Sequence, residues 1–148
     1  MSMSVYSRFK REPSGFRALV ELLESTPPSR RQKMIDVGMK EDPEYTKKAM
    51  AYVFSFQDIL ALADMELAEV LSKVPGKIVG FALHGLDSEI QKKCIGLMKP
   101  PGMGEAKEFL DATAGNNEIN GARLKVISTA RELEKRGFVK SKRIPENP

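Results

Sequence analysis

The stretch EDPEYTKKAMAYVFSFQDIL, from Glu41 to Leu60, indicates the organisation of the fold, because it places Phe54 and Phe56 between two segments of helical character. Asp42 followed by Pro43 is typical of a helix N-terminus, since aspartate caps the first turn and proline is accepted in it. The VFSF alternation resembles a strand, but it is short and its flanks follow a helical pattern. We therefore interpret it as a connector whose aromatic side chains need an explanation.

Further helices are predicted on both sides of this connector. A loose arm over residues 1–13 precedes a helix opened by Ser14, and the STPPS segment ends that helix because proline cannot continue it. Ser29 and Gln32 form a capping box for the next helix, which is expected to end near Gly38. After the connector, helices are expected over residues 56–63, 64–74, 75–83, 87–98, 105–111 and 119–136, with KPPGMG (99–104) and TAGNNEING (113–121) as loops and Gly137 as the last C′ residue.

The sequence predicts an all-α fold. No stretch shows sustained alternation with hairpin turns, and eight or nine short helices joined by short turns favour a helical superhelix or a compact bundle. The 148 residues suffice for one domain or two small helical subdomains, and 41% apolar and 30% charged residues are typical of a soluble globular protein. There is no membrane-spanning apolar run and no signal-peptide pattern, and a single cysteine makes the cytoplasm the expected compartment.

No catalytic, cofactor or metal constellation is recognised. His84 is the only histidine and stands beside Gly85, where a capping or surface role is favoured over a base. Cys94 falls on an apolar helix face and is interpreted as a buried small hydrophobe. PPGMG lacks the Lys-Ser/Thr pair of a phosphate-binding loop. A binding or mechanical protein is therefore favoured over an enzyme.

The net charge of +4 is modest and scattered, but it is denser near the C-terminus. The basic residues there are Lys135, Arg136, Lys140, Lys142 and Arg143. A solvated helix end explains them, since cations are favourable near a helix C-terminus. A small basic helical nucleic-acid-associated protein remains the alternative, and its binding to random DNA would weaken steeply with salt.

Four segments together resemble the C-terminal half of the flagellar motor switch protein FliG family. They are SGFRALVELLES, KEDPEYTKKAMAYVFSFQDI, LAEVLSKVPGKIVGFALHGLDSEIQKKCIGLM and ARELEKRGFV, in order from Ser14 to Val139. The resemblance implies an armadillo-like right-handed superhelix in two subdomains. Its expected divisions are an N-terminal arm (1–13), an armadillo-like module (14–52), a hinge (53–56), a C-terminal helical subdomain (57–139) and a basic tail (140–148).

The resemblance also gives the connector a role, because the family has a hinge of the form Met-Phe-x-Phe at this place. The matching residues are Val53, Phe54, Ser55 and Phe56. Burying an aromatic ring contributes about 1.5–3 kcal/mol, and two docked arrangements of similar energy would make a bistable joint. A rigid loop with both rings fixed in a core is the alternative. Val53 replaces the methionine and has fewer rotamers, so a stiffer joint is expected.

The family's torque-bearing surface is matched only in part. Its lysine falls on His84, its arginine on Pro101, and its acidic pair near Glu108 and Phe109, so only Glu108 keeps its sign. The surface predicted to face a stator carries a mixed charge pattern, and a merely solvated helix face is the alternative. Its residues are His84, Glu105, Lys107, Glu108 and Asp111.

The resemblance implies protein partners and no cofactor: rotor proteins such as FliM or full-length FliG, and a stator protein such as MotA. The family's middle module is not matched, so an apolar patch is expected to be exposed and to form a homodimer or dock on a rotor protein. Its residues are Phe16, Leu19, Val20, Leu23, Met34 and Ile35. Nucleic acid and membrane insertion are not expected, and the implied location is the cytoplasm, peripheral at the inner-membrane basal body. Met1 is typical of a native start, and a fragment of a longer protein stays an alternative.

Overall fold

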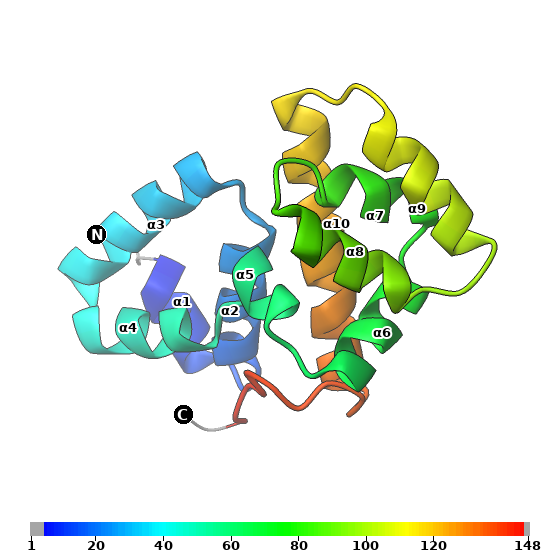
Figure 1. Ribbon diagram of the computed structural model, residues 1–148. Coiled ribbons are helices and arrows are strands. Elements are labelled where there is room, and N and C mark those ends of the chain that lie inside the picture. The colour runs from blue at the N-terminus through cyan, green and yellow to red at the C-terminus, as the bar shows by residue number, and fades with distance from the viewer. Residues whose placement is uncertain (1–4, 147–148) are drawn as a thin grey trace. The chain divides into compact units, whose positions relative to one another are not determined.

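The all-α prediction is confirmed by the computed structural model, which describes residues 5–146 (Figure 1). This part of the chain contains ten helices and no strand. They are α1 (Val5–Arg11), α2 (Gly15–Ser25), α3 (Pro28–Glu41), α4 (Pro43–Tyr52), α5 (Phe56–Leu60), α6 (Asp64–Ser72), α7 (Gly76–Ala82), α8 (Ser88–Gly96), α9 (Gly102–Asp111) and α10 (Asn116–Lys135). Of the helices described, none combines the length and apolarity needed to span a bilayer.

The chain divides into two compact units, and it passes between them twice. The first unit runs to Phe54 and resumes at Lys142, so it holds α1–α4 and the C-terminal segment. The second unit runs from Ser55 to Ser141 and holds α5–α10. The first passage, from Phe54 to Ser55, lies inside the range predicted for the hinge, and the second, from Ser141 to Lys142, lies where the sequence predicted only a basic tail.

The first unit is built around an aromatic and aliphatic core. The Phe16 ring lies with its centroid 5.6 Å from that of Tyr45 and 5.8 Å from that of Tyr52, which joins α2 to α4. The buried members of the core are Tyr6, Phe16, Leu19, Val20, Leu23, Tyr45, Ala49 and Ile144. These residues come from three helices and the C-terminal segment, so elements distant in sequence close one core.

Both chain ends differ from the prediction. Residues 5–11 form helix α1 instead of a loose arm, because Tyr6 is buried in the core and its hydroxyl donates to the Met34 carbonyl. Gly38 makes this packing possible, since a Cβ there would lie 2.5 Å from both Thr46 Oγ1 and Tyr6 Cζ. The expected basic tail contains Ile144, which is buried in the same core. Residues 1–4 and 147–148, also placed in the arm and tail, lie outside the described part of the chain.

The second unit is organised around α7, which packs against both α9 and α10. Gly76 and Gly80 lie one turn apart on α7 and allow α9 to come close, because a Cβ would lie 2.6 Å from the Gly102 carbonyl oxygen and 2.6 Å from the Ala106 carbonyl oxygen, respectively. In Figure 1, α10 runs through this unit beside α7 and α6. Its inward face is formed by Ala122, Val126, Ile127, Ala130 and Leu133.

Helix boundaries depart from the prediction at several loops. The helix predicted to begin at the Ser29–Gln32 capping box begins instead at Pro28, with no side-chain cap, and extends to Glu41. Helix α9 begins at Gly102, inside the expected KPPGMG loop, directly after Pro100 and Pro101. Helix α10 begins at Asn116 because Glu118 accepts the Gly115 N–H at 3.3 Å. Gly137 follows α10 with φ +83°, as expected of a C′ glycine.

Candidate functional site

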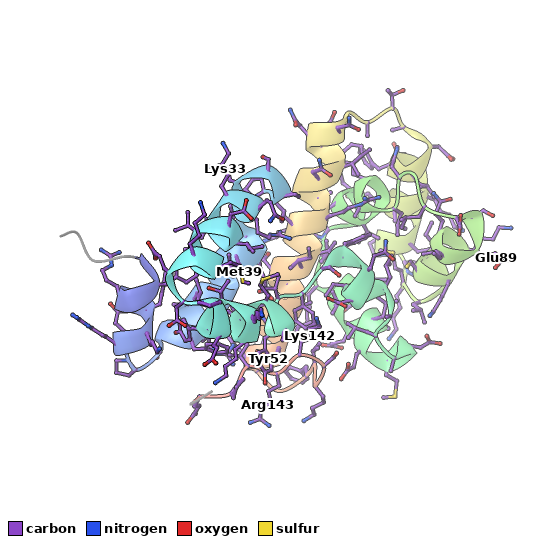
Figure 2. All side chains as sticks on the ribbon, turned by 90° about the vertical axis from the view of Figure 1, so that its left-hand side faces the viewer. Lys33, Met39, Tyr52, Glu89, Lys142 and Arg143 are labelled. Atoms are coloured by element: carbon purple, nitrogen blue, oxygen red, sulfur yellow. The ribbon has the colours of Figure 1, made fainter. Side chains whose placement is uncertain are left out.

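The connector begins with a peptide group that is held by the first unit. The Phe54 N–H donates to Glu24 Oε2 at 2.8 Å, and the Val53 carbonyl of the same peptide group accepts from Lys142 Nζ at 3.3 Å. Glu24 is buried, and Figure 2 shows Lys142 near Tyr52, at the end of α4. An acidic and a basic side chain thus bind the two polar atoms of one peptide group.

The connector ends with groups that are held by the second unit. The Ser55 N–H donates to Asp58 Oδ2 at 2.8 Å, and the Asp58 N–H donates to Ser55 Oγ at 3.1 Å, which completes a capping box for α5. The Phe56 ring lies under the Arg123 guanidinium, 5.0 Å from the ring centroid. Arg123 belongs to α10, so Phe56 is fixed to the body of the second unit.

These contacts divide the predicted hinge at one residue. The peptide group before Phe54 is bonded within the first unit, and the peptide group after it is bonded within the second. Between the two peptide groups lie only φ and ψ of Phe54, since each peptide group is planar. The Phe54 side chain is completely buried. Motion at the hinge stays a prediction, and it would involve these two torsions together with the second passage between Ser141 and Lys142.

Three residues that support the connector were missed in the sequence. Glu24 stands in an amphipathic helix, where an acid is ordinarily solvated. Arg31 donates to the carbonyls of Leu23 at 2.7 Å, Glu24 at 3.2 Å and Thr26 at 3.1 Å, at the end of α2. Burial lowers the pKa of Arg31, and the charge of Glu24 acts in the opposite direction. Lys142 has a positive φ of 53° at the second passage between the units, which no side chain pattern signals.

Helix α9 carries most of the surface predicted to face a stator. Lys107, Glu108 and Asp111 are exposed on it. Glu105 is exposed too, but its Oε1 accepts the Lys77 N–H at 2.9 Å, in the first turn of α7. Because it satisfies one of the free N–H groups of that turn, Glu105 has a structural role beside any contact with a partner.

His84 differs from the exposed charged residues of α9 in its burial and its hydrogen bonding. It is half-buried, and its Nε2 lies 2.9 Å from the Phe109 carbonyl oxygen. Arg123 donates to the His84 carbonyl at 2.7 Å and to the Ala82 carbonyl at 3.0 Å, so it satisfies the C-terminal end of α7. Burial lowers the pKa of Arg123. The five predicted stator-facing residues therefore divide into Lys107, Glu108 and Asp111, which are free of such bonds, and His84 and Glu105, which tie α7 to α9.

The predicted self-association face is corrected by the structure. Phe16, Leu19, Val20 and Leu23 are buried in the core of the first unit, where α1, α4 and the C-terminal segment cover α2. Met34 and Ile35 are half-buried and pack against the same core. The apolar face was identified, but its partner is this chain. Among the side chains of this unit that the structure describes, the large apolar ones that remain exposed are Leu22, Val37 and Met50.

The acidic, histidine and cysteine side chains of the described residues are dispersed or buried. Across residues 5–146, no three His, Cys, Asp or Glu residues gather in a way that could hold a metal ion. Cys94 is buried, and burial raises the pKa of its thiol. The candidate functional features are therefore the connector over residues 53–56, whose peptide groups are hydrogen-bonded to side chains, and the exposed charged face of α9.

A known protein family matches the part of the chain that contains both features. The FliG C-terminal domain model matches residues 39–140, which is more than half of the chain and includes both the connector and α9. The chain belongs to the FliG C-terminal domain family. The resemblance found in the sequence segments is thereby confirmed.

Two curated relatives with similar sequences are flagellar motor switch proteins named FliG. The flagellar motor switch protein FliG of Borreliella burgdorferi is 27% identical over 128 residues, covering 84% of this chain and 37% of the relative. That of Thermotoga maritima is 26% identical over 135 residues, covering 90% of this chain and 40% of the relative. The chain therefore spans about two fifths of the length of these relatives.

Solved structures agree on the fold. A crystal structure of a FliG fragment from H. pylori covers 85% of this chain and 60% of its own, with a TM-score of 0.61 and 19% identity. Full-length FliG from Aquifex aeolicus covers 83% of this chain and 39% of its own, with a TM-score of 0.50 and 26% identity. Both support the all-α assignment.

Proposed function

We propose that this chain is a non-enzymatic scaffold of a flagellar rotor, working in the cytoplasm at the basal body. The observation that carries this proposal is the family match over residues 39–140, which includes both the connector and α9. The relatives are named flagellar motor switch proteins, and a switch needs a part that contacts its neighbours and a part that changes conformation.

The contact part is the exposed face of α9. Lys107, Glu108 and Asp111 form a short row of mixed charge that faces solvent. Such a row can steer a partner of complementary charge and fix its register, although each exposed ion pair contributes only about 0.2–1 kcal/mol. The partner proposed for it is a charged cytoplasmic segment of a stator protein such as MotA.

The conformational part is the connector. Phe54 separates a peptide group bonded to Glu24 and Lys142 from a peptide group bonded to Asp58. Rotation about its two backbone torsions, with a matching change at the second passage between Ser141 and Lys142, would reorient one unit while leaving these three hydrogen bonds in place. The change from bonds within the first unit to bonds within the second at this one residue supports a hinge here.

Attachment to the rotor is proposed for the first unit. The predicted buried face is not free for this purpose, so docking on FliM, on full-length FliG or on a second copy is assigned to the exposed Leu22, Val37 and Met50. Scattered apolar side chains of this kind are ordinary on a surface, and their substitution tests whether they matter.

Swimming assays in the host test the stator contact. Glu108→Lys together with Asp111→Lys should impair motility, and Glu89→Lys is the matched control, because Glu89 is exposed on α8, outside the α9 row (Figure 2). Partial rescue by charge reversal in the stator would show a direct contact. Normal swimming of the α9 variant would contradict the proposal.

A further inference from the structure

The second unit has a basic hollow that the proposed motor role does not use. It is an open depression of about 260 Å³ between the C-terminal end of α6 and the middle and second half of α10. Lys73, Lys125 and Arg136 supply three positive charges to its walls, and Glu132 supplies one negative charge. We refer to these residues and the space between them as the basic hollow.

The three cations of the basic hollow are available to a partner. Lys73, Lys125 and Arg136 are exposed, and within residues 5–146 none of their side chains pairs with an acidic group. The Arg136 guanidinium lies over the Phe138 ring, 5.4 Å from its centroid, and this contact leaves its charge unneutralised. Lys73 and Arg136 are the C-cap residues of α6 and α10, where a cation is favourable by itself. Lys125 lies in the middle of α10 and has no such reason to be basic.

The hydroxyl groups of the hollow indicate which anion it can take. Ser128 Oγ and Thr129 Oγ1 both donate to the Lys125 carbonyl, at 3.0 Å and 2.8 Å. Their protons are therefore not free for a phosphate, and the helix ends nearby present carbonyls rather than N–H groups. Only the three cationic side chains can bind an anion here.

We propose that the basic hollow binds an acidic segment of a partner protein. Carboxylates on flexible side chains of a peptide can each turn toward one cation and away from Glu132, whereas the phosphates of a nucleic acid are fixed in its backbone and one of them would face Glu132. The surface belongs to α6 and α10, and it does not depend on the role proposed for α9. It would give this chain a second docking site, selective for acidic sequences.

Binding of a fluorescent octaglutamate peptide tests the proposal directly. Fluorescence anisotropy at low salt is measured on the full chain, on Lys125→Glu and on the control Lys92→Glu, an exposed lysine of α8 without a pairing partner among the described residues. Lys125→Glu should weaken binding about tenfold and Lys92→Glu less than about twofold, because a charge reversal replaces an attraction by a repulsion only where the peptide lies.

A second variant and a competitor make the outcome decisive. Lys73→Glu should weaken octaglutamate binding as Lys125→Glu does, and thermal melting checks that each variant is folded. Equal weakening by Lys92→Glu, or no binding by the unmodified chain, would overturn the proposal. Tighter binding of an oligothymidylate of equal charge, lost in Lys125→Glu, would overturn it in favour of a nucleic-acid site.

Discussion

Glu24 is the residue whose replacement tests the connector most sharply. Its carboxylate is buried and accepts the Phe54 N–H at 2.8 Å, thirty positions away in the sequence. Glu24→Gln keeps the size of the side chain and an acceptor oxygen but removes the charge. Glu24→Leu removes the acceptor as well, so the Phe54 N–H loses its partner.

The expected costs follow from the kind of hydrogen bond that is lost. A bond to a charged group contributes about 1.5–3 kcal/mol and a neutral one about 0.5–1.5 kcal/mol, so Glu24→Gln should lower the free energy of unfolding by about 1 kcal/mol. An unsatisfied buried N–H costs about 1–3 kcal/mol, and Glu24→Leu should therefore lose about 2–4 kcal/mol. Glu12→Gln is the control, since Glu12 is exposed and its side chain forms no ion pair with any of the described residues.

Urea unfolding and amide hydrogen exchange together measure these effects. Exchange of the Phe54 amide should become at least about fivefold faster in Glu24→Gln, because 1 kcal/mol of lost stability raises the open population by about that factor. Amides in the second unit should change little. If Glu24→Leu leaves both the unfolding midpoint and the Phe54 exchange rate unchanged, the hydrogen bond does not hold the connector.

Four further substitutions test the packing and hydrogen bonds around the site. Gly80→Ala should destabilise the chain by about 1–3 kcal/mol in thermal melts, because the added Cβ would meet the α9 backbone. Gly104→Ala has open space around it and should stabilise the chain by about 0.5–1 kcal/mol. Equal effects of the two substitutions would contradict the close packing of α7 and α9. The hydrogen bond from Lys10, and to a smaller extent that from the Tyr45 N–H, lowers the pKa of Asp42. The ionised Asp42 therefore stabilises the fold fully above the ordinary aspartate pKa of about 3.9, and this stabilisation is lost as the pH falls through the lowered pKa. Acid unfolding curves of Asp42→Asn should therefore be flatter below about pH 4 than those of the unmodified chain, and parallel curves would refute this. Arg123→Met should lose about 2 kcal/mol in urea unfolding, since the carbonyls at the end of α7 lose two hydrogen bonds, and a neutral result would show that water replaces them.

Some local signals in the sequence predicted local structure, whereas the Ser29–Gln32 capping box did not, since α3 begins at Pro28 without a side-chain cap. Asp42 and Pro43 begin α4 as expected, and the Asp42 carboxylate accepts the Tyr45 N–H at 3.2 Å. Gly137 has the positive φ that a C′ position requires. These features depend on residues within one turn of each other, and sequence spacing is enough to recognise them.

Features that depend on distant partners were not predictable in the same way. The apolar face of α2 was recognised, but the elements that cover it, α1 and the segment around Ile144, come from the two ends of the chain. Each of these is short and flanked by charged residues, so neither shows a core pattern by itself. The roles of Glu24 and Lys142 likewise depend on the connector peptide group to which they are hydrogen-bonded, and this group is remote from both in sequence.

Residual dipolar couplings measured on the intact chain in one dilute aligning medium test the central claim most directly. If Phe54 is a pivot, the amides of α2–α4 and those of α6–α10 should each fit one alignment tensor, and the two tensors should differ in magnitude. A single tensor that fits both sets within experimental error would mean that the units tumble as one body, and the hinge would have to be abandoned.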